Sequence, residues 1–193
     1  MLLDYIRRNH ADNISLPRIE RHEMQILSED TLPKFIKAFD EHKFYTALFT
    51  GLREGEVTGL TWHCVDFEAG TLHIRQQLQR ERKQGSQYKF MSLKNDKPRT
   101  ITPAPAVMQR LKAEQKKQRD NRRELGTAWS NPMNLVFTNE LGGYLRNETV
   151  YKMFKQIAVR LGEPKLRMHD LRHSYAVHAL RSGDDIKEQC RIR

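Results

Sequence analysis

The most regular apolar pattern in this 193-residue chain lies between residues 150 and 161. Apolar side chains fall there at positions i, i+3, i+4, i+7, i+8 and i+11, namely Val150, Met153, Phe154, Ile157, Ala158 and Leu161. Residues at this spacing share one face of an α-helix, so the pattern predicts a helix that buries this face in a core. We expect Asn147 to cap the start of this helix and Gly162 to end it.

Weaker patterns of the same kind predict further helices over about residues 29–39, 44–50, 54–60, 104–124 and 169–181. Ser28 stands before the first of them and can accept a hydrogen bond from the free amides of a helix start. The helix over 104–124 carries a run of lysines and arginines between Lys112 and Arg123. Such a run is usually a solvated helix face, and contact with nucleic acid there is an open alternative.

The pattern changes between residues 62 and 102, where alternating and β-branched residues favour extended backbone. Strands are predicted at Thr71–Ile74, Gln87–Met91 and Arg99–Thr102, which would form one small antiparallel sheet. Leu135–Phe137 is expected to be a short buried strand or an extended piece. The predicted fold class is therefore mainly α with a small antiparallel β-sheet (α+β).

The length suits one principal domain with an appendage. Residues 1–25 are predicted to be the end of a helix followed by an extended linker that contains Pro17, and residues 26–193 to be the principal domain. Cys64 and Cys190 lie far apart without a CxxC partner, so both are expected to be reduced thiols. No apolar run reaches membrane-spanning length and no signal peptide is evident, which predicts a cytoplasmic protein.

The chain is strongly basic, with 34 Lys and Arg against 24 Asp and Glu, a formal charge of +10. A polyanionic partner is the simplest reason for such an excess, because each phosphate contact releases condensed counterions. Charge retained for solubility is the alternative. Composition alone therefore favours a nucleic-acid partner only modestly.

Three separated segments carry residues suited to phosphate chemistry. Arg53 lies at the junction of two predicted helices with Glu56 one turn later, Lys94 lies at the tip of a predicted hairpin, and His169 and Arg172 share one helix face. A guanidinium fork can hold two non-bridging phosphate oxygens, so two arginines can clamp a phosphoryl transition state without a metal. A lysine can protonate a leaving oxygen, and a histidine can hold a proton at neutral pH.

Other interpretations of these residues are weaker. His169 and His173 have the spacing of a zinc pair, but no third ligand is placed nearby, so no metal site is predicted. Asp170, His173 and Ser174 lie too close on one helix to form a hydrolase triad, and His173 and Ser174 are expected to brace the helix or touch a backbone phosphate. The basic residues near Lys94, which are Lys89, Lys97 and Arg99, are candidate DNA contacts, although any of them could be merely solvated.

In order and spacing, the TGLRxGE segment, the lysine and the HxxR segment together resemble the tyrosine recombinases, or phage-type integrases, particularly those of conjugative transposons. The resemblance covers about residues 26–190. It implies a tyrosine-recombinase catalytic-domain fold, with Arg53 and Arg172 stabilising the phosphorane and Lys94 as general acid for the leaving 5′ oxygen. His169 would assist proton transfer, Glu56 would orient Arg53, and His173 would be a further supporting residue behind the catalytic ones.

The family resemblance also implies double-stranded DNA as partner, a tetramer of the full-length enzyme on DNA, and no metal or other cofactor, since bond energy is kept in a 3′-phosphotyrosine link. Relatives place a Gly-His box and the nucleophilic tyrosine beyond the point where these residues end, and a helical DNA-clamping domain ahead of the linker. We therefore expect this chain to be shortened at both ends, to lack the nucleophile and to be inactive alone, with Tyr175 a core residue. The alternatives are a catalytically dead DNA-binding remnant or regulator of a mobile element and, more remotely, a metal-dependent nuclease, which the missing carboxylate cluster argues against.

Overall fold

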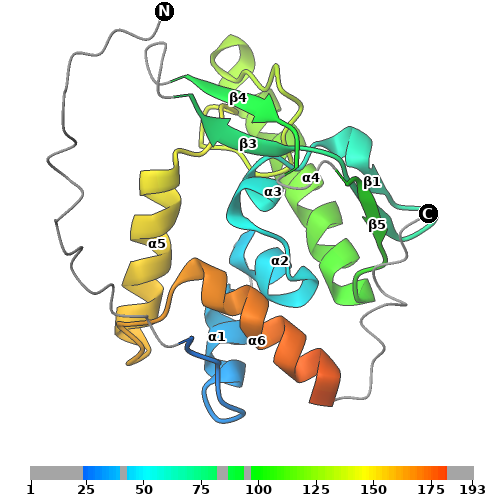
Figure 1. Cartoon of the computed structure of the whole chain (residues 1–193). Helices are drawn as coiled ribbons and strands as arrows, with labels where there is room; N and C mark the ends of the chain where they lie inside the picture. The colour runs from blue at the N-terminus through cyan, green and yellow to red at the C-terminus, as the bar shows by residue number, and fades with distance from the viewer. Residues whose placement is uncertain (1–23, 40–42, 82–86, 94–96, 182–193) are drawn as a thin grey trace, which may run out of the picture.

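A computed structural model describes residues 24–39, 43–81, 87–93 and 97–181 of the chain. Its helices are α1 (Leu32–Phe39), α2 (Lys43–Thr50), α3 (Glu54–Thr58), α4 (Pro105–Leu125), α5 (Asn147–Arg160) and α6 (Met168–Arg181), with short 3-10 turns η1 (Trp62–Cys64) and η2 (Gly126–Ala128). Figure 1 shows the helices forming most of the body, with the strands beside α3 and α4. The predicted fold class is confirmed.

The strands form two small antiparallel sheets rather than the one sheet predicted. They are β1 (Val65–Asp66), β2 (Thr71–Ile74), β3 (Gln77–Arg80), β4 (Tyr88–Met91) and β5 (Arg99–Ile101). One sheet has the order β1-β2-β5, with Leu72 opposite Ile101, and the other pairs β3 with β4, with Leu78 opposite Phe90. The sequence did not reveal β3, because its residues are mostly polar and only Leu78 is a large apolar side chain.

The core lies where α1, α2 and α5 meet. Phe35 and Phe39 of α1, Phe44 of α2 and Phe154 of α5 are fully buried. Their rings touch in series, with centroids 5.4 Å apart between Phe35 and Phe39 and 5.6 Å apart between Phe44 and Phe154. The apolar stripe predicted for residues 150–161 therefore does face the core, as its spacing required.

The two predicted helix caps had different outcomes. Ser28 accepts a hydrogen bond from the Thr31 amide at 3.2 Å, as expected, although α1 itself begins at Leu32. Asn147 does not cap α5: it is the first residue of that helix, and its amide instead donates to the Tyr88 hydroxyl at 2.8 Å. A tertiary contact from β4 thus satisfies the first amide of α5, and the Asn147 side chain does not act as the cap.

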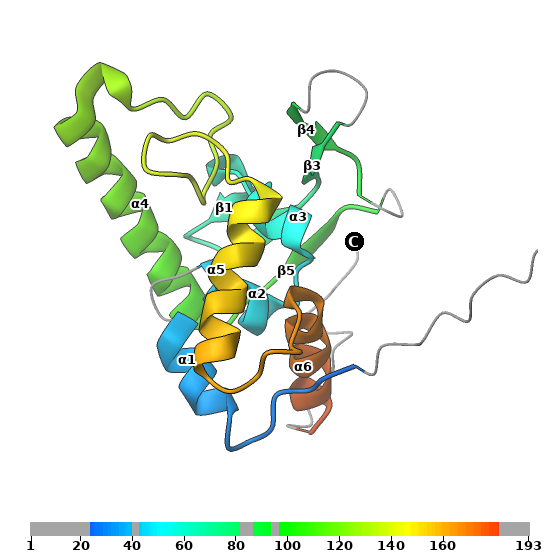
Figure 2. The same ribbon diagram turned by 90° about the vertical axis from the view of Figure 1, so that its left-hand side faces the viewer.

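Helix α4 is long and extends along one side of the molecule (Figure 2). Its basic residues from Lys112 to Arg123 are exposed, but Gln118 is buried and accepts a hydrogen bond from the Trp62 indole at 3.0 Å. The same amide donates to the Val136 carbonyl at 2.7 Å, so it holds the 135–137 segment, whose Leu135 forms one isolated bridge with Thr61. That segment is extended, as one of the two predicted alternatives required.

Cys64 is a buried free cysteine, as predicted, whereas Cys190 lies outside the described residues. Within the described part of the chain, no helix is long and apolar enough to cross a membrane. Most of the predicted linker, residues 1–23, lies outside the description, so the domain boundary at residue 25 stays a prediction.

Candidate phosphate-binding site

The Arg53 side chain is fixed by the start of α3. Arg53 is the N-cap of this helix, with φ −69° and ψ 155°, and Glu56 is the third residue inside it. The Glu56 carboxylate accepts a hydrogen bond from the Arg53 amide at 2.9 Å and another from Arg53 Nη1 at 3.0 Å. Because Glu56 is 1% exposed and Arg53 is 34% exposed, the carboxylate anchors the guanidinium from below while leaving part of it at the surface.

Glu56 also binds a second arginine from the neighbouring sheet. Arg99 of β5 donates from Nη1 to Oε1 at 3.0 Å and from Nη2 to Oε2 at 2.6 Å, which is a two-pronged contact. Burial would raise the pKa of the Glu56 carboxyl, but the hydrogen bonds from Arg99 and Arg53 outweigh burial, and the pKa lies below its usual value. Glu56 is therefore ionised at neutral pH and joins α3 to β5.

The HxxR helix meets the same junction. Arg172 of α6 donates from Nη1 to the carbonyl of Gly51, which lies between α2 and Arg53. Gly51 has φ +60°, and a Cβ atom added to it would lie 2.6 Å from the Tyr175 ring, so α6 crosses the end of α2 in close contact. The structure therefore brings two segments 121 residues apart together, within two residues of Arg53.

Tyr175 is only partly buried, which corrects the expectation that it lies in the core. Its ring lies at the crossing of α6 with α2, against Gly51. The aromatic side chain thus serves as packing at the helix crossing rather than within the fully buried cluster.

Helix α6 starts in the same way as α3. Asp170, which is fully buried, accepts a hydrogen bond from the Arg167 amide at 2.9 Å. Its carboxylate also forms an ion pair with Arg167 Nη2 at 3.1 Å. In both helices an arginine precedes the first turn and a carboxylate three residues later folds back to it. This role of Asp170 was not predicted, although an acid three residues after a helix start is a local signal that indicates it.

The other side of α6 is tied to the segment before α1. The Ser174 hydroxyl donates to the Asp170 carbonyl at 2.9 Å and accepts from the Leu27 amide at 3.0 Å. His178 Nε2 lies 2.9 Å from the Leu27 carbonyl. Ser174 therefore braces the helix, which is one of the two roles expected for it.

The two histidines of the HxxR helix touch each other. The rings of His169 and His173 are perpendicular, with centroids 4.7 Å apart. Partial burial lowers the pKa of His169, and the neighbouring His173 and Arg172 lower it further. The imidazole of His169 is thus neutral at neutral pH and able to accept a proton. Among the described residues, no group of three or more His, Cys, Asp or Glu could hold a metal ion.

The basic residues before β5 are only partly described. Lys94 lies outside the described residues. The hairpin predicted around it is wrong, because β4 pairs with β3 while β5 pairs with β2, so the 92–98 segment joins two sheets. Lys89 is exposed and lies 2.5 Å from Glu81, and Lys97 is exposed. The predicted DNA contacts of Lys89, Lys97 and Arg99 stay predictions.

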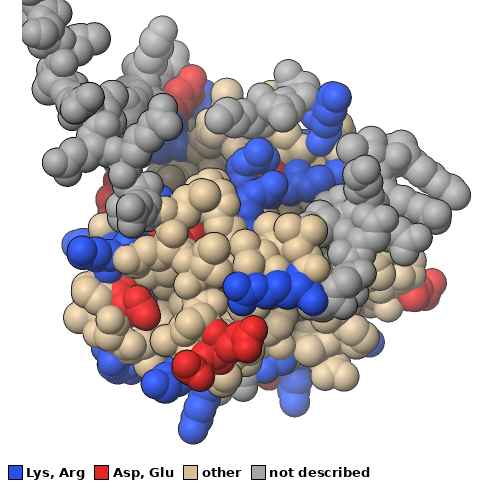
Figure 3. Space-filling model, turned by 60° about the horizontal axis from the view of Figure 1, so that its bottom comes forward, with Lys and Arg blue, Asp and Glu red and all other residues tan. Residues whose placement is uncertain are grey.

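Figure 3 shows the face that comes forward when the bottom of Figure 1 is turned toward the reader. Lysine and arginine side chains gather in its upper middle, beside a largely uncharged surface. The electrostatic character of this face suits an anionic partner.

Three relatives share the sequence pattern of this chain. A family model described as "Phage integrase family" matches residues 18–189. The XerC-like tyrosine recombinase of Caldanaerobacter subterraneus subsp. tengcongensis is 29% identical over 179 residues, covering 86% of this chain and 46% of that protein. The putative prophage phiRv2 integrase of Mycobacterium tuberculosis is 27% identical over 173 residues, covering 86% and 43%. XerA of Pyrococcus furiosus is 25% identical over 184 residues, covering 92% and 55%. The chain thus spans about half the length of these relatives.

Solved structures share the fold. The Tn1549 transposon integrase in complex with a circular intermediate DNA has a TM-score of 0.71 and 19% identity, covering 88% of this chain and 57% of that chain. The crystal structure of XerA recombinase has a TM-score of 0.63 and 23% identity, covering 90% and 55%. At these identities the likeness concerns the backbone arrangement.

Proposed function

Since this chain belongs to the phage integrase family and has the catalytic-domain fold of a tyrosine recombinase, we propose that it binds duplex DNA and holds a scissile phosphodiester for site-specific recombination. Its solved neighbours include an integrase bound to DNA, which supports DNA as the partner. In the full-length enzyme, assembled as a tetramer on DNA in the cytoplasm, the reaction would be metal-free strand cleavage and rejoining through a 3′-phosphotyrosine.

The observation that carries this proposal is the hydrogen bond from Arg172 to the Gly51 carbonyl. It brings α6, which carries Arg172, to the loop that ends in Arg53, so the two arginines belong to segments that meet two residues before Arg53. Fixed guanidinium groups stabilise charge on the oxygens of a five-coordinate phosphorane better than water does, because they need no reorganisation. Glu56 holds Arg53 in place for this role.

Proton transfer is assigned to the remaining residues. His169, whose pKa is lowered, takes or holds the proton of the attacking group, with His173 against its ring. Lys94 is proposed as the acid that protonates the leaving 5′ oxygen. Tyr175 is the only tyrosine of the sequence after Arg172, and its contact with Gly51 argues against its acting as the nucleophile.

A second candidate function follows from that placement of Tyr175. A chain that uses the two arginines only to hold DNA would serve as a non-catalytic DNA-binding regulator. The two candidates differ in whether the clamp recognises the transition state of phosphoryl transfer or only the phosphate of intact DNA.

The test uses a fluorescent duplex with a central nick, titrated with the whole chain at low salt. Binding is expected to weaken steeply with salt because phosphate contacts release counterions. Orthovanadate, which adopts the five-coordinate geometry, is expected to tighten binding to the nicked duplex about tenfold or more, and Arg172→Ala to abolish that gain. Lys34→Ala, on the exposed face of α1 and outside the basic run of α4, is the matched control.

Each outcome of this titration decides between the candidates. Salt-sensitive binding without a vanadate effect would favour the regulator, and absence of binding would contradict both. The same nicked duplex, denatured after incubation, is expected to show no covalent protein adduct. An adduct would show that a tyrosine of this chain does attack, and Mg²⁺-dependent cutting would contradict the metal-free mechanism.

A further inference from the structure

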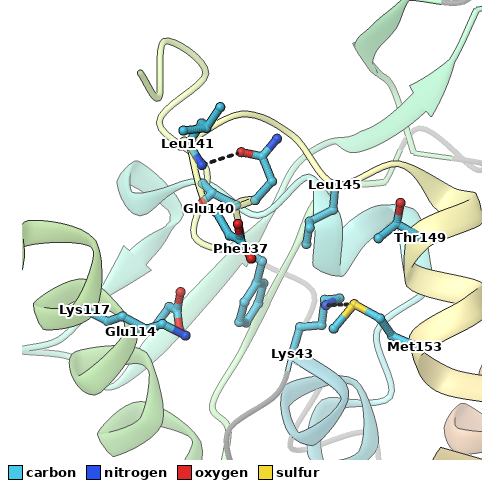
Figure 4. A pocket seen from close by; sticks show the side chains of 11 residues that line it. Lys43, Glu114, Lys117, Phe137, Glu140, Leu141, Leu145, Thr149 and Met153 are labelled. Atoms are coloured by element: carbon cyan, nitrogen blue, oxygen red, sulfur yellow. Dashed lines mark hydrogen bonds between the residues drawn. The ribbon is translucent and has the colours of Figure 1, made fainter. Parts of the chain in front are cut away.

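A pocket of about 530 Å³ lies away from the arginine junction, between α2, α4, α5 and the segment that connects α4 to α5. Its lining includes Lys43 from α2, Glu114 from α4, Phe137 and Leu145 from the connecting segment and Met153 from α5 (Figure 4). The volume lies in the range typical of small-molecule sites, and the walls combine apolar side chains with polar and charged ones. Nothing in the proposed recombination chemistry uses it.

The Lys43 amine at the floor of this pocket is short of hydrogen-bond acceptors. The residue is 7% exposed, and its Nζ points toward Met153, whose sulfur lies 3.8 Å away (Figure 4). The amine also lies 5.0 Å from the centroid of the Phe44 ring. Among the described residues, no oxygen accepts a hydrogen bond from it. A thioether is a weak acceptor, and an ammonium group has three donors, so the buried charge lacks adequate partners.

We propose that this pocket binds a small organic carboxylate, whose oxygens meet the Lys43 amine and whose apolar body lies against Phe137, Leu145 and Met153. The carboxylate supplies the oxygen acceptors that the described residues do not, and a charge-assisted hydrogen bond is stronger than one between neutral groups. A neutral apolar ligand would leave the amine without acceptors, and a cation would meet it with like charge.

The other charged groups of the lining are compatible with an anion. Helix α4 contributes Glu114 and Lys117, the connecting segment contributes Glu140, and α5 contributes the uncharged Thr149 and Met153. Burial raises the pKa of the Glu114 carboxyl, against the opposing effect of Lys117 and Lys43. Glu114 therefore takes up a proton more readily than an exposed glutamate and repels an entering carboxylate less.

Ligand binding is coupled to proton uptake for the same reason. Burial lowers the pKa of Lys43, with Glu114 opposing that effect and Lys117 adding to it. An entering carboxylate favours the ammonium form of Lys43 and the protonated form of Glu114. Affinity consequently falls as pH rises through the titration of these groups.

The pocket and the arginine junction are separate sites. Lys43 begins α2 and Arg53 follows its end, and the eight residues of that helix span about 12 Å. Failure of carboxylate binding would therefore leave the proposed DNA function intact, and loss of DNA binding would leave the pocket intact.

Octanoate is a suitable probe, with octanamide and octylamine as matched neutral and cationic probes of the same length. The whole chain is titrated at neutral pH, and amide chemical shifts are followed by NMR. Saturable shifts around the pocket are expected for octanoate at concentrations up to about 10 mM, with binding at least about tenfold weaker for the other two probes. Lys43→Met is expected to reduce octanoate affinity by the same factor, and Lys116→Met to leave it unchanged.

A second variant keeps the test decisive if Lys43→Met fails to fold. Glu114→Gln retains the amine and removes a carboxylate, so it is expected to raise octanoate affinity severalfold and to weaken its dependence on pH. The proposal is overturned if octanoate shows no saturable binding, if octanamide binds as well as octanoate, or if a folded Lys43→Met protein binds octanoate like the wild type.

Discussion

Glu56 in α3 and Lys43 at the start of α2 are two buried ionisable residues whose surroundings have opposite effects on their charged forms. Glu56 is 1% exposed and accepts hydrogen bonds from Arg53 and Arg99. Lys43 is 7% exposed and contacts a sulfur atom and an aromatic ring. Burial has a similar extent at both residues, so the difference lies in the partners.

The pKa directions express this difference. Hydrogen bonds hold the pKa of Glu56 below its usual value despite burial, so the charged form is the stable one. Burial holds the pKa of Lys43 below its usual value, so the charged form is the one that the fold disfavours. A buried charge with matched partners fixes neighbouring elements, whereas one without them leaves a place for a ligand.

The largest effect is expected from removing the partnered charge. Glu56→Ala leaves Arg53 and Arg99 without their carboxylate, so the free energy of unfolding should fall by about 3 kcal/mol. Urea denaturation followed by circular dichroism measures it. Glu148→Ala is the control, because Glu148 pairs with Arg80 at 2.7 Å but is 57% exposed, and its loss should cost less than about 1 kcal/mol. Equal costs for the two variants would contradict the importance assigned to burial.

The contact between the end of α2 and α6 can also be disturbed by adding a side chain at Gly51. Gly51→Ala places a Cβ at a φ of +60° and 2.6 Å from the Tyr175 ring, so we expect a loss of about 2 kcal/mol in unfolding free energy. Gly70→Ala is matched in backbone, with φ +65°, but meets nothing within 4 Å. The difference in unfolding free energy between the two variants measures the contact of α6 with α2. Equal losses in the two variants would mean that the Tyr175 ring does not pack tightly against Gly51.

Removing the unpartnered charge should have the opposite sign. Lys43→Met replaces the amine with an apolar side chain of similar length in an apolar setting, so the free energy of unfolding should rise by about 1 kcal/mol. Thermal and urea denaturation in the absence of any carboxylate measure this gain. A destabilised Lys43→Met protein would indicate that the amine has stronger partners than its sulfur and ring contacts.

The smallest expected effects are changes in how the unfolding free energy depends on pH, one in the acid range and one in the alkaline range. Because the pKa of Glu56 is lowered from 4.5, its contribution to stability is present above that value and is lost as pH falls through the folded-state pKa. Because the pKa of Lys43 is lowered from 10.5, its penalty is present at neutral pH and is relieved as pH rises toward 10.5. Stability profiles should therefore lose the acid slope in Glu56→Ala and the alkaline slope in Lys43→Met. Profiles parallel to the wild type would contradict these assignments.

The candidate site was predictable where its residues are close in sequence. Arg53 stands at a predicted helix junction with Glu56 one turn later, and helix periodicity placed His169 and Arg172 on one face, so both pairs were visible in the sequence. The contact of Glu56 with Arg99, 43 residues away, was not predictable, because the separation of β5 from β4 into another sheet decides it. The same separation overturned the hairpin predicted around Lys94.

The sequence alone determined the helical character of the chain, the core face of α5 and the residues suited to phosphate, since all of these follow from local spacing and residue chemistry. Tertiary structure decided that β3 pairs with β4, that the Tyr88 hydroxyl binds the first amide of α5, and that Lys43 is buried without an oxygen partner among the described residues. The reason is physical: periodicity encodes which face of an element is apolar, whereas hydrogen-bond partners and burial depend on which distant element covers that face.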